Sequence, residues 1–421
     1  MMKCRSCSLL LFLLILAVCA GCATTLPPSY EIDTDGRVLD GNVLALAGDG
    51  GIVAAATSDG LFLKKNGGPW EKLETPGIRN PGRVTCLGVN GEEIAVGTDG
   101  EGLHLFSGST WEVRTSRYGG LADDGVLSLA YDGSDEGLEG STLWIGTRKG
   151  ITARHGDDWK VYTPGKDWLV SMTGKSSTAA GKVYVGSGFK LGERGGDSDT
   201  FRPPVTAIGV GSSSLVLGNS NSRIAMVAGD TVAAILLRDD VSTLRDDISV
   251  RNLIVKEPVI WVGTNTGLIW GGLRGSNLGK PWPTNHGYLT WSGVLYGSRD
   301  SRPFEYRWKL LGYNTAVVTD QVSNGSNLWV AYRAEKGVRT FQSKLRDKQN
   351  DVVVVDEENQ TSGVRLFPSL DDYILRREVP VFENYSLNAG IKGNPSALYV
   401  SPDSSTVWVG TDKGLWELKA Y

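Results

Sequence analysis

The sequence has 421 residues, with 43 Lys and Arg against 47 Asp and Glu, and it contains no block of basic residues. This mildly acidic balance argues against nucleic acid as a partner, because binding to nucleic acid needs clustered positive charge. Of the five cysteines, only Cys86 lies beyond residue 22, so an intrachain disulfide is excluded in the remainder of the chain.

The first 21 residues have the pattern of an export signal. Lys3 and Arg5 precede a short apolar run, Leu9–Val18, and small residues follow it. This run is too short to span a bilayer as a mature helix. We therefore expect residues 1–21 to be a signal peptide, residues 22–29 to be a Pro-containing tether, and residues 30–421 to form one folded domain.

The string Cys19-Ala20-Gly21-Cys22 resembles a bacterial lipobox, although that motif usually has Leu where Cys19 stands. The resemblance implies that Cys22 receives the lipid and becomes the first residue of the mature protein. Ala23 follows instead of Asp, the usual inner-membrane retention residue. This favours the outer membrane, facing the periplasm or the cell surface, with membrane contact through the lipid only. The alternative is an ordinary secreted protein cut near the same place.

One short stretch recurs along the rest of the chain. It is Leu143–Ile151, and it returns as Ile260–Leu268, as Val407–Leu415 and, more loosely, as Ile94–Leu103. Each copy is an apolar run, then a glycine-rich turn, then a second apolar run, which is typical of a tight β-hairpin. Hairpins that recur at a roughly constant period predict a repeat architecture.

A strand of the form Val-x-small-Leu precedes each hairpin, and an aromatic-led strand follows it. Most spacings between the first strands fit one four-stranded blade of a β-propeller, and two longer spacings need insertions. We therefore expect an all-β chain with a single propeller of eight blades, and seven blades as the alternative. The predicted first strands begin at Val43, Val84, Val126, Leu169, Val205, Val250, Asn314 and Pro395.

Two kinds of side chain have a predicted place in each blade. Buried aromatic area stabilises packing, so the fourth-strand aromatics should be wedges between neighbouring blades. These aromatics are Trp70, Trp111, Trp159, Phe201 and Phe382. The small third residues of the first strands should line the crowded centre. They are Ala45, Cys86, Ser128, Ser171 and Ala207. Cys86 is therefore interpreted as a small buried residue and not as a nucleophile.

The two ends of the repeat region complement each other. The last copy ends with its third strand, Gly414–Tyr421, whereas Tyr30–Thr34 has the aromatic-first form of a fourth strand. We expect the N-terminal strand to complete the C-terminal blade. This closure would remove two exposed sheet edges and hold the ring shut without a disulfide.

These repeats resemble the two-component regulator propeller repeats, whose pattern is Trp-Ile-Gly-Thr, a short turn, Gly-Leu and an aromatic-led strand ending in Tyr-Thr. The segments Leu143–Thr163 and Val407–Leu418 match it well. The resemblance implies a propeller of the kind that forms periplasmic input regions of sensor kinases, often linked to polysaccharide use. No membrane helix, kinase or helix-turn-helix pattern follows the last repeat, so we expect a recognition surface without an output domain.

No motif in the sequence predicts catalysis or a cofactor. His104, His155 and His286 are not spaced as a metal pair on one element. Neither a Gly-x-Ser-x-Gly elbow nor a phosphate loop occurs. We therefore name no catalytic residue and no metal ligand. A carboxylate pair that the fold brings together across a cleft stays open as an alternative.

Function tends to lie on loops that a rigid scaffold holds in place. In propellers, the loops between fourth and first strands and between second and third strands converge on one face. Here that face is rich in basic and aromatic residues, namely Arg79, Arg83, Arg117, Tyr118, Arg148, Lys149, Lys166, Trp168, Lys190, Arg202 and Arg333. They are either solvated charge or a groove for an anionic or sugar-containing polymer or for a protein partner.

These observations favour a non-catalytic binding module that recognises a glycan or an envelope protein. The first alternative is an enzyme, a propeller polysaccharide lyase or hydrolase, which would need acid and base groups at the mouth of the central channel. The second alternative is an assembly scaffold in the cell envelope.

Overall fold

The computed structural model describes residues 30–132, 141–165, 201–212 and 391–420, together with shorter segments between them. Those segments are 169, 172, 182–187, 190–193, 214–221, 223–228, 231–236, 249–256, 259–265, 267–273, 289–290, 316–324, 327–334, 340–342, 352–354 and 363–367. Strands dominate these residues, and one short 3₁₀ helix, η1 (Pro81–Arg83), precedes the second blade. Within this described part, no helix is both long and apolar enough to cross a membrane.

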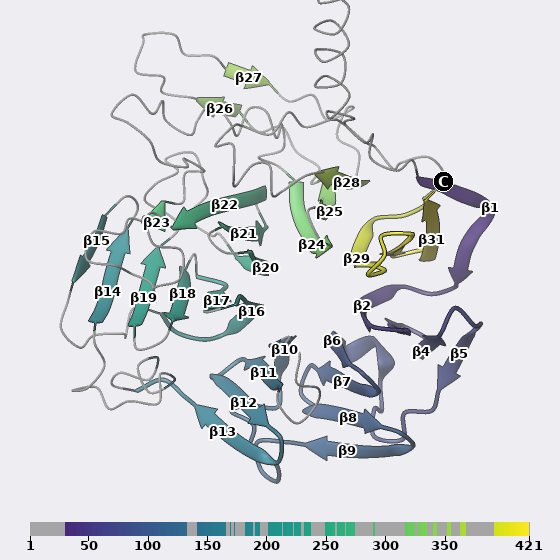
Figure 1. Cartoon of the computed structure of the whole chain (residues 1–421), viewed down its shortest axis with the longest axis horizontal. Helices are drawn as coiled ribbons and strands as arrows, with labels where there is room; N and C mark the ends of the chain where they lie inside the picture. The colour runs from purple at the N-terminus through teal and green to yellow at the C-terminus, as the bar shows by residue number, and fades with distance from the viewer. Residues whose placement is uncertain are drawn as a thin grey trace, which may run out of the picture.

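The chain is a β-propeller, with antiparallel blades placed around one centre (Figure 1). Each blade is named here by its innermost strand. The β2 blade contains β2 (Val43–Asp49), β3 (Ile52–Thr57), β4 (Gly60–Lys65) and β5 (Trp70–Leu73). The β6 blade contains β6 (Val84–Asn90), β7 (Glu93–Thr98), β8 (Leu103–Ser107) and β9 (Thr110–Arg114). The β10 blade contains β10 (Val126–Tyr131), β11 (Thr142–Thr147), β12 (Ile151–His155) and β13 (Asp158–Tyr162).

The remaining blades follow in chain order around the ring. The β16 blade contains β16 (Val205–Val210), β17 (Leu215–Asn219), β18 (Arg223–Ala228) and β19 (Thr231–Leu236). The β20 blade contains β20 (Val250–Lys256), β21 (Val259–Thr264), β22 (Gly267–Leu273) and β23 (Leu289–Thr290). The β24 blade contains β24 (Ala316–Asn324), β25 (Asn327–Ala334) and β28 (Gly363–Phe367). A separate ribbon pairs β26 (Thr340–Gln342) with β27 (Val352–Val354).

The closing blade joins the two ends of the chain, as the sequence predicts. It contains β29 (Pro395–Val400), β30 (Thr406–Thr411), β31 (Gly414–Ala420) and, at its outer edge, β1 (Tyr30–Leu39). The register pairs Tyr30 with Ala420 and Ile32 with Leu418, and the strand continues past a bulge. The N-terminal strand therefore fastens the ring through backbone hydrogen bonds, and it is longer than the five residues predicted.

Every innermost strand carries a β-bulge at the second residue of the Val-x-small-Leu pattern. In β6, for example, Val84 pairs with Thr98 and Cys86 pairs with Gly97, so Thr85 is the extra residue. The corresponding residues in the other innermost strands are Leu44, Leu127, Thr206, Arg251, Thr319 and Ser396. A bulge bends a strand and increases its twist, which allows the innermost strands to crowd around one axis.

Hydroxyl groups on several innermost strands connect one blade to the next. The Oγ1 atom of Thr85 donates to the carbonyl oxygen of Val126 at 2.7 Å, and Ser396 Oγ donates to Val43 O at 2.6 Å. Thr206 makes the same contact with the next blade. Each of these bonds gives a backbone carbonyl group of the next innermost strand a hydrogen-bond donor from the neighbouring blade.

The first valine of a blade packs its side chain against the glycine of the Trp-x-Gly-Thr-like strand in the blade before it. A Cβ atom on Gly97 would lie 2.7 Å from Val126 Cγ1, and one on Gly263 would lie 2.7 Å from Val318 Cγ1. Gly146 faces Val205 in the same way. A side chain at these three glycines would press on the neighbouring blade, so the glycine permits the close approach there. In β3 and β25 the equivalent residues are Ala56 and Ala331, so those two junctions accommodate a methyl group.

The threonine that ends the same motif holds the hairpin turn. Thr98, Thr147 and Thr411 are fully buried, and each hydroxyl donates to a turn glycine carbonyl, as in the 2.8 Å bond from Thr98 Oγ1 to Gly102 O. Gly102 and Gly414 have φ values of +85° and +136°, which side chains rarely adopt. The Gly-Thr and Gly-Leu parts of the repeat therefore describe one turn.

The predicted aromatic wedges are confirmed for the fourth strands that the structure describes. Trp111 packs on a cluster that the β2 and β6 blades share, and its Nε1 atom donates to the carbonyl oxygen of Glu74 at 2.9 Å. Trp159 packs between the β6 and β10 blades, and Trp70 between the closing and β2 blades. Phe201 is buried but precedes β16 and does not lie on a strand. Phe382 lies outside the described residues.

The predicted first strand at Leu169 is wrong. The amide of Met172 donates to the carbonyl oxygen of Leu169 at 3.2 Å, as in a helical turn, and Leu169 is buried between the β10 and β16 blades. The next apolar runs, β14 (Lys182–Ser187) and β15 (Lys190–Glu193), extend the outer edge of the β16 blade, where β14 runs parallel to β19. An apolar run can thus satisfy its backbone at a sheet edge instead of starting a blade.

The predicted first strand at Asn314 is displaced from the observed one. The bulge in β24 lies between Val318 and Asp320, and Val318 faces Gly263, so the Val-x-small-Leu unit begins at Val318. Asp320 stands where a small residue was expected and Gln321 where Leu was expected. Gln321 fits its buried position because its Nε2 atom donates to the carbonyl oxygen of Trp261 at 3.0 Å.

Innermost strands from seven blades line the centre in the described part of the chain. The small residues predicted there are confirmed for Ala45, Cys86, Ser128 and Ala207, whereas Ser171 lies outside the described residues. The blade total, eight or seven, stays a prediction.

Closure by β1 predicts that removing residues 30–39 from the mature protein lowers its melting temperature, since β31 would lose its partner and the ring its fastening. Circular dichroism during heating measures this. As a control, removal of residues 22–29 alone should leave the melting temperature unchanged. Equal melting temperatures for the two deletions would contradict closure by β1.

Candidate functional site

Several of the predicted face residues come together where the β6 and β10 blades meet. They lie on the loops between β5 and β6 and between β9 and β10, and on the hairpin turns after β7 and β11. Backbone hydrogen bonds join these segments, such as Asp99 N to Arg83 O at 2.8 Å and Arg148 N to Gly125 O at 3.1 Å. We call residues 74–83, 99–102, 115–125 and 148–150 the loop face.

Basic side chains on the loop face have acidic partners. Asp99 lies between Arg148, which donates to its Oδ1 atom, and Arg83, whose NH2 atom is 3.8 Å from Oδ2. The Nζ atom of Lys149 is 2.7 Å from Asp123 Oδ2. The loop face therefore carries interspersed charges of both signs instead of the basic surface that the predicted residues suggest.

The pKa of Asp123 reports this pairing. Burial acts to raise it, but the hydrogen bonds from Lys149 and from the amide of Gly125, together with the charges of Lys149 and Arg148, outweigh burial and lower the pKa. Asp123 is therefore ionised at neutral pH, and so is Lys149, whose pKa the same contact raises.

Arg117 and Tyr118 project from the loop between β9 and β10. The guanidinium carbon of Arg117 lies 4.9 Å from the centre of the Tyr118 ring, and the amide of Tyr118 donates to Thr115 Oγ1 at 3.1 Å. Tyr118 is 75% exposed, which is unusual for so large an aromatic side chain. The loop backbone thus presents an aromatic ring to solvent beside a cation.

One further predicted residue, Arg79, also belongs to the loop face, whereas the others lie elsewhere or are undescribed. Arg79 is exposed on the loop before η1, where its amide donates to Glu101 Oε2 at 3.2 Å. Arg202, which precedes β16, and Arg333, on β25, are exposed but belong to other blades. Lys190 begins β15, and its side chain lies outside the described atoms. Lys166 and Trp168 lie outside the described residues.

A second charged cluster is buried between the same two blades. Both terminal NH2 groups of Arg154 donate hydrogen bonds to the carboxylate of Glu93. The same carboxylate accepts a 2.7 Å hydrogen bond from the hydroxyl of Tyr131. Glu93 is only 8% exposed. The bidentate ion pair, with the tyrosine hydroxyl as a third donor to the carboxylate, therefore joins the two blades.

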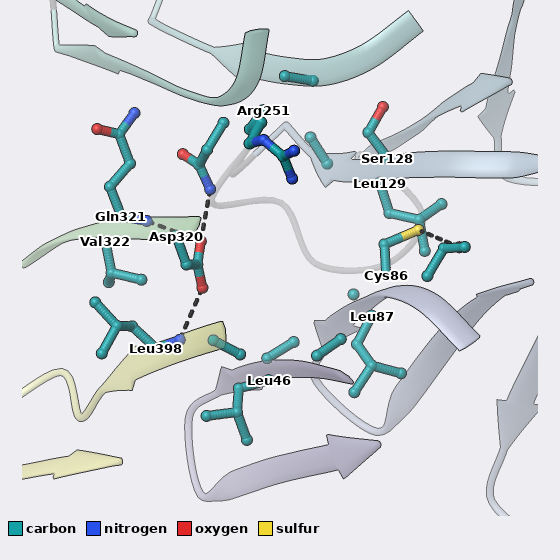
Figure 2. A pocket seen from close by; sticks show the side chains of 18 of the residues that line it. Leu46, Cys86, Leu87, Ser128, Leu129, Arg251, Asp320, Gln321, Val322 and Leu398 are labelled. Atoms are coloured by element: carbon teal, nitrogen blue, oxygen red, sulfur yellow. Dashed lines mark hydrogen bonds between the residues drawn. The ribbon is translucent and has the colours of Figure 1, made fainter. Parts of the chain in front are cut away.

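A central cavity of about 470 Å³ lies between the innermost strands. Its lining is mostly apolar or small, and its ionisable members are Arg251, Asp320, Cys86, Tyr131 and Tyr399. Figure 2 shows Arg251 projecting from β20 into this space and Asp320 on the neighbouring strand. The volume is in the range of small-molecule sites.

Three of these groups are neutral at physiological pH. Burial raises the pKa of the Cys86 thiol to about 12 and that of the Tyr399 hydroxyl to about 12, and it also raises the pKa of Tyr131. A protonated thiol is a poor nucleophile, which agrees with the interpretation of Cys86 as a small packing residue.

Asp320 connects three innermost strands. Its carboxylate accepts hydrogen bonds from Asn252 Nδ2 at 2.6 Å, from the amide of Leu398 at 2.7 Å and from the amide of Gln321 at 2.8 Å (Figure 2). Burial raises the pKa of Asp320 to about 7, and the two amide donors only partly oppose this. The carboxyl group therefore changes its charge close to neutral pH.

The sequence reasoning did not single out Arg251, Asn252 or Asp320. The signal was present, because Arg251 and Asn252 stand at the x and small positions of the Val-x-small-Leu unit that starts at Val250. Asp320 was missed because its unit was placed four residues too early. In the segments that the structure describes, no three His, Cys, Asp or Glu side chains are grouped as a metal site.

Comparisons with known proteins give structural likeness alone. No family model and no curated protein matches this chain. Among solved structures, the extracellular domain of the hybrid two-component system BT4673 from B. thetaiotaomicron is 12% identical with a TM-score of 0.48. That match covers 94% of this chain and 40% of the other, so this chain spans less than half of that domain.

Two further solved structures match over most of both chains. YCF48 bound to D1 peptide is 12% identical with a TM-score of 0.47, and the match covers 95% of this chain and 97% of that one. Streptogramin B lyase is 11% identical with a TM-score of 0.48, and the match covers 94% and 98%.

The raised pKa of Asp320 predicts a pH dependence of stability. Between about pH 4 and pH 7 the folded protein keeps the proton that the unfolded chain releases, so its free energy of unfolding falls as the pH rises, by at most about 1.4 kcal/mol per unit, and this effect ends above pH 7. Urea unfolding of wild type and Asp320→Asn at several pH values measures this. The free energy of unfolding of wild type minus that of Asp320→Asn should fall as the pH rises from about 4 to about 7, and a pH-independent difference would contradict the prediction.

Proposed function

We propose that this chain is a non-catalytic binding module of the cell envelope, exported and anchored by a lipid on Cys22. The lipobox-like string before Cys22 supports the anchor. The resemblance of the repeats to the two-component regulator propeller family supports a role in recognition. In this proposal the protein belongs to that family, and the loop face contacts a glycan or another envelope protein.

The exposed pair of Arg117 and Tyr118 is the observation that carries this proposal. Leaving a tyrosine ring 75% exposed forgoes the stabilisation that its burial would contribute. Tyr and Arg are also the side chains that most often dominate binding energy in protein interfaces, because they offer large contact area together with polar groups. The ring and its hydroxyl group can also stack on and hydrogen-bond a sugar.

The charge pattern around this pair limits the kind of ligand. Arg83, Arg148 and Lys149 already interact with Asp99 or Asp123, so the loop face offers donors and acceptors side by side. A polyanion would meet these carboxylates and be repelled, whereas a hydroxyl-rich glycan or a protein with mixed charges would find partners for both kinds of group. Of the ligands considered from the sequence, the anionic polymer is therefore disfavoured.

The rigid scaffold beneath the loop face suits recognition without rearrangement. The β5–β6 loop and the β9–β10 loop each begin and end on strands of packed blades. In the β9–β10 loop, hydrogen bonds such as that from the amide of Ser116 to Asp124 Oδ1, at 2.6 Å, fix the backbone. A surface that is ordered before binding loses less conformational entropy when the complex forms.

The test is a crosslinking pull-down from membranes of the native host, with the protein kept lipidated, together with a glycan array. The double variant Arg117→Ala, Tyr118→Ala should lose at least about tenfold of the recovered partner or bound glycan. Lys72→Ala, an exposed substitution on β5, is the control and should bind as wild type does. Unchanged binding by the double variant would contradict the loop-face proposal.

The lipid anchor has its own test, which is membrane fractionation of Cys22→Ala. A Cys22→Ala protein that stays in the membrane fraction would contradict the lipid anchor.

A further inference from the structure

The innermost strands follow one pattern with a cluster of departures. At the second residue, other strands carry Leu or a hydroxyl side chain, whereas β20 carries Arg251. At the third residue they carry Ala, Cys or Ser, whereas β20 carries Asn252 and β24 carries Asp320. All three departures lie on two neighbouring strands. Places where a repeat breaks its own packing rule are expected to be functional or strained sites.

Arg251 differs in kind from the residues at the equivalent positions. The equivalent residues either pack as Leu44 and Leu127 do or connect blades through a hydroxyl, as Thr85 does. Arg251 is exposed even though it stands on an innermost strand, and Figure 2 shows its guanidinium group in the cavity. A long cation in this narrow space places a positive potential inside low-dielectric walls, which concentrate the field.

We propose that the central cavity binds a small organic carboxylate, with its anionic group on Arg251 and its polar body against the β20 and β24 wall. A guanidinium group offers two parallel N–H donors that match the two oxygens of a carboxylate. The cavity, at about 470 Å³, has room for a ligand of the size of an amino acid or a single sugar acid.

The opposite wall complements this arrangement. Ala45 and Cys86, on the innermost strands farthest from β20 around the ring, are small, so they leave the space open across from Arg251. Asn252 is fixed by its 2.6 Å hydrogen bond to Asp320, which keeps its amide in one orientation beside the arginine. This site is separate from the loop face and does not depend on the function proposed for that face.

Asp320 makes the site sensitive to pH. Below about pH 7 its carboxyl group is protonated, and Arg251 is then the one charged side chain in the lining. Above pH 7 the ionised Asp320 lies close to the bound carboxylate and repels it. The other ionisable groups of the lining, Cys86, Tyr131 and Tyr399, stay neutral through this range because burial raises the pKa of each.

Binding of D-glucuronate and L-glutamate, each compared with its neutral counterpart D-glucose or L-glutamine, tests the proposal. Isothermal titration calorimetry at about pH 6 should show that wild type binds at least one of the carboxylates, and its neutral counterpart at least about tenfold more weakly. Arg251→Gln should lose at least about tenfold in affinity. The control Arg37→Gln, an exposed arginine on β1, should bind as wild type does.

A second comparison uses pH. Affinity of wild type should fall between about pH 6 and about pH 8, and Asp320→Asn should remove this fall. The Arg117→Ala, Tyr118→Ala variant should bind the carboxylate as wild type does, which separates this site from the loop face. Failure of wild type to bind either carboxylate, or equal affinity in Arg251→Gln, would overturn the proposal.

Discussion

The contact between the first valine of one blade and the second-strand glycine of the blade before it recurs at five of the seven described junctions and sets the spacing of the blades there. Val126 on Gly97 and Val318 on Gly263 are two instances. Because the glycine has no side chain, neighbouring blades approach until the valine methyl groups touch backbone. The bulged innermost strands and the hydroxyl bonds between blades lie beside these contacts, around the narrow centre.

The contact also explains which parts of the fold could be predicted from the sequence and which could not. The Trp-x-Gly-Thr and Val-x-small-Leu motifs record the two sides of one interface, so they predicted the blades and the closure by β1. They failed where a side chain fills the same role by other chemistry. Asp320 and Gln321 replace apolar packing with hydrogen bonds, and the pattern around them was missed. Leu169 is buried in the core between the β10 and β16 blades, but it lies on a turn, and hydrophobic patterning cannot distinguish such a turn from a strand.

Side chains that the packing between blades does not constrain are the ones available for function. Loops between blades do not contribute to the valine and glycine contacts, so they can carry groups such as Tyr118 without weakening the fold. The sequence predicted that Arg83 and Arg148 belong to one face, but it could not predict that both bind Asp99, because that contact depends on how two blades are juxtaposed. The innermost strands are more constrained, so Arg251 departs from a stricter pattern than any loop residue does.

A double-mutant cycle on Gly263 and Val318 tests most directly whether this contact organises the ring. Gly263→Ala alone should lower the free energy of unfolding by about 1–3 kcal/mol, since its Cβ would lie 2.7 Å from Val318 Cγ1. Val318→Ala removes that methyl group, so the same glycine substitution should then cost less by at least about 1 kcal/mol. An equal cost in both backgrounds would contradict the account.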